Sequence, residues 1–489
     1  MYYQKFGISN FRCINDQTDI EIRPITLNIG PNNSGKSTLL KSLELLRRSS
    51  LNNQHNSQII SAIKSRQMPE LGSPTSFLFN NQVPFSYFLY IKNEDLPSEL
   101  NHHEVKIKIS YKFKTISNLS GNSKTDAYLD KEGIITQLDL YINKELTITF
   151  YTDILDQVHS YQNGNADYYS NGYILITNNL YFGLLFNTLT PLKFTTSKFP
   201  VEFPDNTFVI PKELISFFSN TLYKYHLKLN KCGENLLTSI LEQVVDFQDK
   251  ISSYQFINLK RTSEKRYIDQ SDEQLFENCL SLFHEGAKFS DILPLIDKLF
   301  VLFDIPKHYK ISHSSDYGYQ IQLSSDKVNY RNIKDYGSGI NQLLTILLTI
   351  LNNRETDALS NYSILKINNE PFSSSLIIVE EPESNLHPNY QTKLADMFLF
   401  LNQNLNLNFL IETHSEYLIR RFQVLIAKKQ INPEDLVINY FWKDPVRSTR
   451  ICKQIYFKEN GRLSDSFEKG FFDETISTQL NLLKLNTLN

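Results

Sequence analysis

Short apolar runs separated by polar turns open the chain. Three of these runs predict β-strands, at residues 3–8, 19–22 and 25–29. Leucines then recur at three- and four-residue spacing over residues 36–46, a period that predicts a helix with one face against a sheet. The third strand, a polar loop and this helix therefore follow one another directly.

Between residues 80 and 210 the pattern changes to alternation of apolar and polar positions. Every second residue is apolar in segments 105–113 and 138–142, and Asn, Gly and Asp turns separate such segments. This alternation predicts an antiparallel, β-rich insertion. Residues 211–250 change to a helical period, and no heptad pattern persists beyond a few turns, which excludes long coiled-coil arms.

A second mixed region begins near residue 285. It predicts a helix that ends at Phe303, strands within 308–323, a helix over 340–351 and a buried strand over 376–380. A further helix, strand and helix extend to about residue 429. We therefore expect an α/β fold in three parts, which are residues 1–80, a β-rich and then helical insertion over residues 81–254, and residues 255–489.

Composition narrows the class of protein. Of 489 residues, 41% are hydrophobic and 21% are charged, as in ordinary folded domains. The 50 Lys and Arg against 53 Asp and Glu argue against a surface coated for non-specific nucleic-acid binding, although a local basic groove is compatible with them. The four cysteines lack metal spacing. Because no apolar segment is long enough to span a membrane, we expect a cytoplasmic protein without membrane contact.

The loop after the third strand carries the first chemical motif. Residues 30–38 read G-P-N-N-S-G-K-S-T and match the phosphate-binding pattern G-x-x-x-x-G-K-[ST]. In this pattern backbone N–H groups at a helix start bind phosphate, Lys36 reaches the β and γ oxygens, and Ser37 ligates Mg2+. The motif predicts ATP and Mg2+ as ligands, with nucleotide contacts from Gly30, Asn32, Asn33, Ser34, Gly35, Lys36, Ser37 and Thr38.

The buried strand over residues 376–380 ends in the second motif. Two carboxylates, Glu380 and Glu381, follow its apolar residues. We expect Glu380 to hold the hydration shell of Mg2+ together with Ser37, and Glu381 to orient the attacking water as general base. An acidic strand end standing alone would fit a solvated edge as well, and its pairing with the phosphate-binding loop favours the catalytic interpretation.

Two later runs carry a family resemblance. E-E-P-E-S-N-L-H-P at 380–388 and I-E-T-H-S-E-Y-L-I-R-R at 411–421 resemble the RecF/OLD-like branch of ABC ATPases. The resemblance implies that Ser384 and Asn385 line a dimer seam and that His414 contacts the γ-phosphate. Taken one by one, Ser384 would equally suit a helix N-cap and His414 an ordinary strand end.

The run D-Y-G-S-G-I-N-Q at 335–342 resembles the degenerate signature motif of the same family. The resemblance implies that Ser338 and Gly339 of one subunit face the nucleotide bound by the other, so that the ATPase acts as a head-to-tail dimer or higher oligomer. It also implies an ABC/SMC-type ATPase head. Asn341 stands where relatives often have Ser, and Glu380 where most such enzymes have Asp, which leaves the rate of hydrolysis open.

The resemblance covers roughly residues 1–80 and 255–475 and implies a separate effector. OLD-type nucleases carry a nuclease domain after the histidine, whereas no Asp-x-Asp cluster follows His414 here. Relatives without that domain include ATPase subunits of anti-phage systems of the Septu and PARIS kind. We therefore expect an antiviral defence ATPase that regulates a partner nuclease or toxin.

Two alternatives stay open from the sequence. One is a RecF-like repair ATPase whose nucleotide state controls DNA binding, with DNA or RNA contacts at the basic clusters 47–48, 260–266, 420–421 and 428–429. The other is a nucleotide-binding scaffold that hardly hydrolyses ATP, suggested by Glu380 and Asn341.

Overall fold

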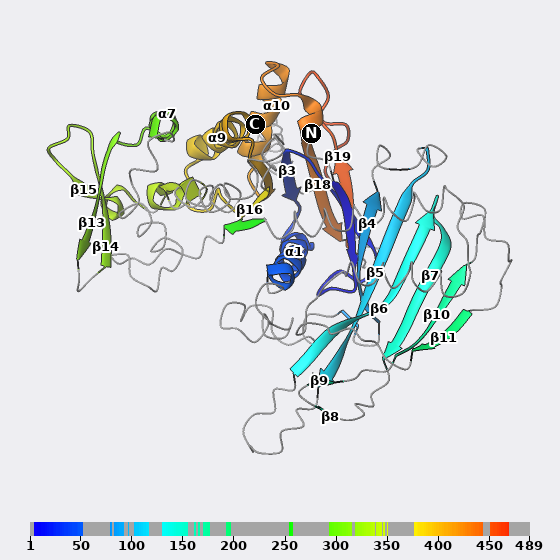
Figure 1. Cartoon of the computed structure of the whole chain (residues 1–489). Helices are drawn as coiled ribbons and strands as arrows, with labels where there is room; N and C mark the ends of the chain where they lie inside the picture. Colours follow the sequence, from blue (N-terminus) through cyan, green and yellow to red (C-terminus); the bar gives the residue numbers. More distant parts are fainter. Residues whose placement is uncertain are drawn as a thin grey trace, which may run out of the picture.

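The structure is a computed structural model, and the described part of the chain holds most of the predicted motifs (Figure 1). The predicted helical stretch 211–250, the basic segment 260–266 and Ser338 lie outside the described residues. These residues are 4–51, 79–80, 83–91, 96, 102–116, 130–154, 161–162, 165–166, 170–176, 192–196, 254–257, 293–314, 318–337, 339–344, 346–347, 350, 376–443 and 450–468.

A six-stranded sheet forms the centre of the head. Its first five strands run parallel, and the sixth is antiparallel to the fifth. Strands buried on both faces often read as continuous apolar runs, as residues 376–380 do up to Glu380. Residues 25–29 instead alternate apolar and polar positions, although all five are buried. The order across the sheet is β12 (Gln255–Ile257), β16 (Leu376–Glu380), β17 (Asn408–Glu412), β3 (Ile25–Ile29), β18 (Leu436–Lys443) and β19 (Arg450–Ile455).

Helices lie on both sides of this sheet (Figure 1). On one side, α9 (Pro388–Leu405) and α10 (Glu416–Ala427) pack against each other and share one apolar core with the strands. On the other side α1 (Lys36–Leu51) follows β3, and its leucines at 39, 40 and 43 are buried. The prediction of an α/β fold is confirmed. Among the described helices none exceeds the 18 residues of α9, so this part of the chain contains no long coiled coil.

An eight-stranded antiparallel sheet stands beside the head. Strand β4 pairs with β1, so strands from the predicted insertion extend the sheet that the N-terminal strands begin. The division at residue 80 stays a prediction, and this sheet contains strands from both sides of it. In order they are β11 (Leu192–Thr196), β10 (Ser170–Ile176), β7 (Glu145–Ile154), β6 (Asp130–Ile142), β5 (Val105–Ile116), β4 (Phe85–Ile91), β1 (Gln4–Ser9) and β2 (Thr18–Ile22).

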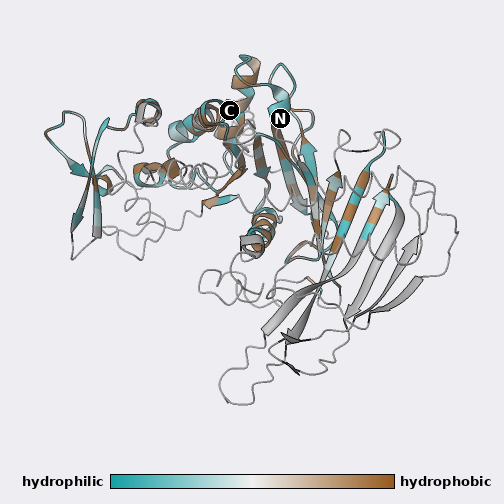
Figure 2. Ribbon diagram, viewed as in Figure 1, coloured by the Kyte–Doolittle hydropathy of each residue, from teal (hydrophilic) through white to brown (hydrophobic). Residues whose placement is uncertain are grey.

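The predicted alternation is visible along β4 and β5, where hydrophobic and hydrophilic residues change places (Figure 2). Val105, Ile107 and Ile109 are buried on the face toward α1, and the hydroxyl of Tyr87 donates to the carbonyl of Ser42 in that helix at 3.1 Å. The helix therefore lies between the two sheets. A two-residue pair, β8 (Tyr161–Gln162) and β9 (Asn165–Ala166), lies apart from both.

A small third lobe leads into the signature-like motif. It consists of α7 (Leu293–Leu302), a sheet of β13 (His308–Ser314), β14 (Gly318–Ser324) and β15 (Arg331–Asn332), and the 3-10 helix η5 (Ile333–Tyr336). Residues 339–344 are helical, as predicted for this segment. A second 3-10 helix, η7 (Pro433–Asp435), enters β18. Within the described residues, no helix is both long and apolar enough to cross a membrane.

A buried asparagine joins the two large sheets. The Asn439 side chain, on β18, donates to the carbonyl of Glu21 at 3.0 Å and accepts from its backbone N–H at 3.2 Å. It also donates to the side-chain oxygen of Asn28 on β3 at 3.1 Å. Because Asn439 is fully buried, its partners have no water to replace it. This contact fixes β2 against the strand that precedes the phosphate-binding loop.

Asn439→Ala should lower the free energy of unfolding by at least about 2 kcal/mol, since it leaves two buried backbone groups without partners. Urea denaturation followed by circular dichroism measures the change. Asn404→Ala is the control, because that exposed side chain bonds only its own helix, to the carbonyl of Phe400, and should cost less than about 0.5 kcal/mol. Equal stabilities of the two variants would contradict the role given to Asn439.

Candidate active site

The loop between β3 and α1 has the backbone shape that its sequence predicts. Gly30 has φ +153°, and a Cβ there would lie 2.1 Å from the carbonyl oxygen of Phe441. Gly35 has φ +116°, which side-chain-bearing residues rarely adopt. Asn33 between them is left-handed, with φ +60°. A loop of this kind at a helix start presents its N–H groups to an anion.

Lys36 is the first residue of α1 and is only 4% exposed. Its ammonium group donates to the carbonyls of Gly30 and Pro31, at 2.9 Å each. Burial lowers the pKa of Lys36, and the nearby carboxylates of Glu412, Glu381 and Glu383 act against that shift. The side chain is therefore a buried cation held by neutral carbonyls, which a phosphate group can replace.

Ser37 donates its hydroxyl hydrogen bond to Oε1 of Glu412 at 2.6 Å. Glu412 is the last residue of β17 and is 2% exposed. Burial raises the pKa of this carboxyl group, while the bond from Ser37 and the charge of Lys36 lower it. Glu412 belongs to the run at 411–421, but the family resemblance of that run implied no role for it.

Neighbouring elements hold the rest of the loop. The guanidinium group of Arg450, at the start of β19, donates to the carbonyl of Asn33 at 3.2 Å and to that of Cys13 at 2.7 Å. The Cys13 sulfur lies 3.1 Å from the Thr38 hydroxyl. No local sequence signal pointed to Arg450, because its contacts are with residues more than 400 positions away.

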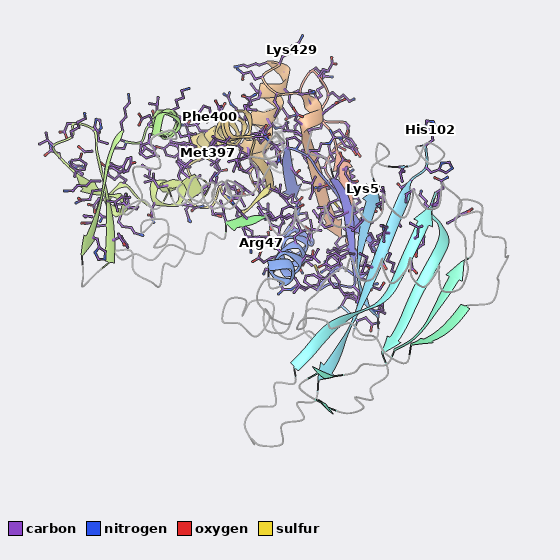
Figure 3. The ribbon with its side chains drawn as sticks, in the orientation of Figure 1. Lys5, Arg47, His102, Met397, Phe400 and Lys429 are labelled. Atoms are coloured by element: carbon purple, nitrogen blue, oxygen red, sulfur yellow. The ribbon has the colours of Figure 1, made fainter. Side chains whose placement is uncertain are left out.

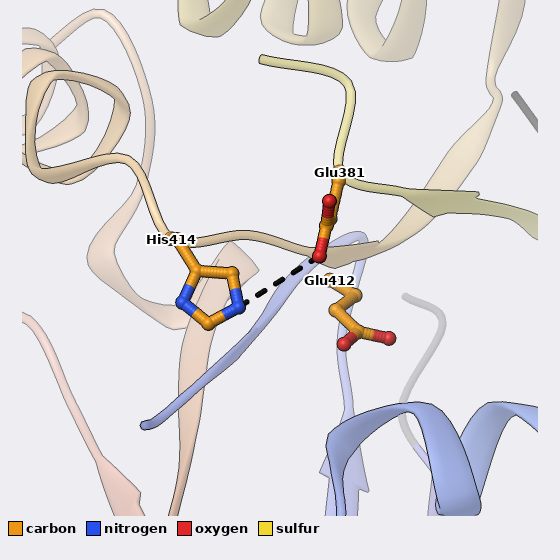
Figure 4. Close-up of side chains that lie close together, drawn as sticks. All are labelled: Glu381, Glu412 and His414. Carbon is orange, nitrogen blue, oxygen red and sulfur yellow. Dashed lines mark ion pairs between the residues drawn. The ribbon is translucent and has the colours of Figure 1, made fainter. Parts of the chain in front are cut away.

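Glu381 follows β16 directly and lies next to His414 (Figure 4). Its Oε1 atom is 3.8 Å from Nε2 of His414, and its Oε2 accepts from the Ser384 hydroxyl at 3.1 Å. Its backbone N–H donates to the carbonyl of Glu412 at 2.8 Å. The φ of +44° is unusual for a residue with a side chain, and such backbone strain gathers at functional sites.

His414 follows β17 and is held through its backbone. Its N–H donates to Oε1 of the buried Glu383 at 2.5 Å. Burial lowers the pKa of the imidazole, the charge of Lys36 lowers it further, and Glu381 opposes both. Burial also raises the pKa of Glu383. The imidazole is therefore favoured in its neutral form at neutral pH.

One cluster among the described residues has the spacing to hold a metal ion. Potential ligand atoms of Glu381, Glu412 and His414 all lie within 4.8 Å of one another. Glu380, the expected magnesium residue, is the register partner of Glu412 on the adjacent strand and lies outside this cluster. Oxygen atoms of Ser37 and Glu412 suit Mg2+, which prefers hard oxygen ligands.

The signature-like segment packs against the turn that follows Glu381. Gln342 donates to the carbonyl of Pro382 at 3.3 Å and accepts from the Asn385 side chain at 3.3 Å. A Cβ on Gly339 would lie 3.2 Å from the carbonyl oxygen of Asn385. Gly339 therefore contacts this turn within its own chain. The N-cap of α9 is His387. The alternative interpretation of Ser384 as a helix N-cap is therefore wrong for this helix.

The structure thus brings four sequence-predicted residues together, Lys36, Ser37, Glu381 and His414, and adds Glu412 and Glu383. A signal for both additions was present in the sequence. Each is an acidic residue that ends or closely follows a buried apolar strand, as Glu380 and Glu381 do. What the sequence lacked was the order of the strands.

A family model for the AAA ATPase domain matches residues 1–419. Comparison with curated proteins gives no match. Matching solved structures include an SMC head bound to the C-winged helix domain of ScpA, at 11% identity and a TM-score of 0.38, covering 94% of this chain and 99% of that one. The SMC head domain from Thermotoga maritima matches at 9% identity and a TM-score of 0.35, covering 93% and 98%. The Smc head of Pyrococcus furiosus, with an extended coiled coil and a bound ScpA domain, matches at 11% and 0.34, covering 99% of each chain.

Proposed function

This chain belongs to the AAA ATPase domain family, and on that premise we propose that it binds ATP with Mg2+ and hydrolyses it as a head-to-tail dimer. The observation that carries the proposal is the meeting of Lys36, Ser37, Glu381 and His414 at the ends of three adjacent strands. A phosphate-binding loop alone supports nucleotide binding. A carboxylate and a neutral imidazole beside it supply what hydrolysis needs.

In the proposed complex the loop N–H groups and Lys36 bind the β and γ phosphates. Lys36 exchanges its bonds to the carbonyls of Gly30 and Pro31 for phosphate oxygens. Ser37 and a carboxylate from the sheet hold Mg2+, which neutralises phosphate charge when bound. Asn33 and the neighbouring loop residues keep their backbone positions through Arg450.

For hydrolysis, Glu381 orients a water molecule toward the γ-phosphate and accepts its proton. His414 lies 3.8 Å from Glu381 and, as a neutral imidazole, can hydrogen-bond a γ-phosphate oxygen or the water. Glu383 fixes the His414 backbone and so orients the ring. The products are ADP and inorganic phosphate.

The exposure of these side chains supports a composite site. The side chains of Glu381 and His414 are 52% and 33% exposed to solvent. Interactions that stabilise a transition state are stronger where water is excluded, so these two side chains need a further surface to cover them. Asn385 is also exposed, beside Gly339. A second subunit placing its Ser338 and Gly339 over the γ-phosphate would cover this side, as the resemblance to ABC ATPases implies.

The nucleotide state then controls a separate effector in the proposal, a nuclease or toxin subunit of an anti-phage system. In the part of the chain that the structure describes, the one acidic and histidine cluster lies at the nucleotide site itself. The proposal assigns the effector chemistry to a partner.

The described basic residues favour a protein partner over nucleic acid. Arg47 on α1 is bound to the carbonyl of Tyr254 and pairs with Glu44, and Arg421 pairs with Asp396 at 2.7 Å. Figure 3 places Arg47 and Lys429 in separate parts of the molecule. These described basic side chains do not form a single track for a phosphate backbone.

Glu381→Gln should reduce ATP hydrolysis by about 100-fold or more, because it removes the general base and keeps the shape of the side chain. It should also accumulate an ATP-bound dimer. Phosphate release and light scattering after size-exclusion chromatography with ATP and Mg2+ measure the two effects. Glu416→Gln, at the start of α10 and paired with Arg420, is the matched control and should leave both unchanged. A parent-like rate in Glu381→Gln would contradict the assignment.

The effector is tested by purifying tagged Glu381→Gln protein from its native host. We expect a nuclease or toxin subunit to co-purify in stoichiometric amount, and to be lost when Lys36 is changed to Ala. Recovery of the chain with no such subunit would refute this part of the proposal. Hydrolysis stimulated by DNA, with binding that falls steeply as salt rises, would support the RecF-like alternative instead.

A further inference from the structure

The strand order places one carboxylate closer to the magnesium-binding serine than the sequence suggests. Strand β17 lies between β16 and β3, and Glu412 is in register with Glu380 on one side and with Asn28 on the other. Because neighbouring strands are about 4.8 Å apart, Glu380 starts one strand farther from the loop that follows β3. Glu412 is on the strand beside that loop.

The side chain of Glu412 is already directed at Ser37. Its Oε1 accepts the Ser37 hydroxyl at 2.6 Å. Its Oε2 is buried and makes no hydrogen bond in the described structure, although the residue is 2% exposed. A buried carboxylate oxygen without a partner is unfavourable unless a cation or donor satisfies it. The geometry therefore leaves an oxygen ligand ready beside the serine.

The surrounding charge also favours a cation. Three carboxylates, of Glu412, Glu381 and Glu383, act electrostatically on the ammonium group of Lys36, and Lys41 also acts on Glu412. The formal charge of the three carboxylates exceeds that of the two lysines. Bound nucleotide phosphates would add further negative charge to the site. A divalent cation near Ser37 and Glu412 would neutralise part of the charge of both the carboxylates and the phosphates.

We propose that Glu412, together with Ser37, ligates the divalent cation of this site, and that Glu380 does not. The assignment rests on the proposed nucleotide-binding function and moves the metal carboxylate from the end of β16 to the end of β17. Glu381 stays free to act on water. The cation class is a hard divalent ion, Mg2+ or its spectroscopic substitute Mn2+.

The test is a titration of Mn2+ followed by electron paramagnetic resonance in saturating ADP. Glu412→Gln and Ser37→Ala should each weaken Mn2+ binding by about tenfold or more, whereas Glu380→Gln should change it less than about threefold. ADP binding in EDTA, which needs no metal ligand, should survive in all three variants. Weakening in Glu380→Gln as large as in Glu412→Gln, or larger, would overturn the assignment.

A combined variant separates a ligand from a residue that only holds the serine in place. If Glu412 ligates the cation, adding Glu412→Gln to Ser37→Ala weakens Mn2+ binding again. If Glu412 only orients the Ser37 hydroxyl, the second change has no further effect, and the assignment is overturned.

Two controls keep the outcome interpretable. Glu412→Asp retains the charge on a shorter side chain, so it should bind Mn2+ with an affinity between those of the parent and Glu412→Gln. If thermal denaturation shows that Glu412→Gln is not folded, Glu412→Asp takes its place in the titration. A parent protein that binds no ADP at all would refute the proposed function, and the metal assignment with it. Normal ADP binding with Mn2+ affinity unchanged in Glu412→Gln would refute the assignment alone.

Discussion

The placement of β17 between β16 and β3 is the constraint on which the whole site depends. Backbone hydrogen bonds continue this pairing past the strand ends, from the Glu381 N–H to the carbonyl of Glu412 and from the Thr413 N–H to that of Asn28. They bring Glu381, which is the proposed general base, together with His414 and the loop at residues 30–38 to one edge of the sheet. Parallel strands end at the same edge, so three segments from separate parts of the sequence meet there.

Several groups of the site are in states that lower the stability of the folded protein. Lys36 is a buried cation, Glu383 and Glu412 are buried carboxyl groups with raised pKa values, and Glu381 has a strained backbone. A carboxyl group whose pKa is raised by folding stabilises the folded state while it is protonated. This contribution to the free energy of unfolding is fully present below the ordinary carboxyl pKa and is lost as pH rises through the raised pKa. At neutral pH these carboxylates therefore lower stability, and the surrounding apolar core compensates. Nucleotide phosphates and a cation would relieve part of that cost, which links ligand binding to stability.

Local patterns predicted the elements that carry the motifs. The loop at residues 30–38 and the strand at 376–380 are confirmed because each depends on adjacent residues, whereas the first helix ends at Leu51 and extends past the predicted Leu46. The order of the strands and the long-range contacts could not be predicted from local sequence patterns. Nothing near Glu412 indicates that β17 would stand beside β3, and nothing near Arg450 indicates its bond to Asn33. The pairing of β4 with β1, across the predicted boundary at residue 80, is likewise a tertiary result.

The central claim is that each nucleotide site is completed by a second subunit. The most direct measurement is ATP hydrolysis by a mixture of Lys36→Ala and Ser338→Arg proteins, each inactive alone. Random pairing makes half of the dimers mixed, and each mixed dimer contains one intact site of two, so we expect about a quarter of the parent rate. A mixture as inactive as its components, or a parent-like rate from Ser338→Arg alone, would contradict the composite site.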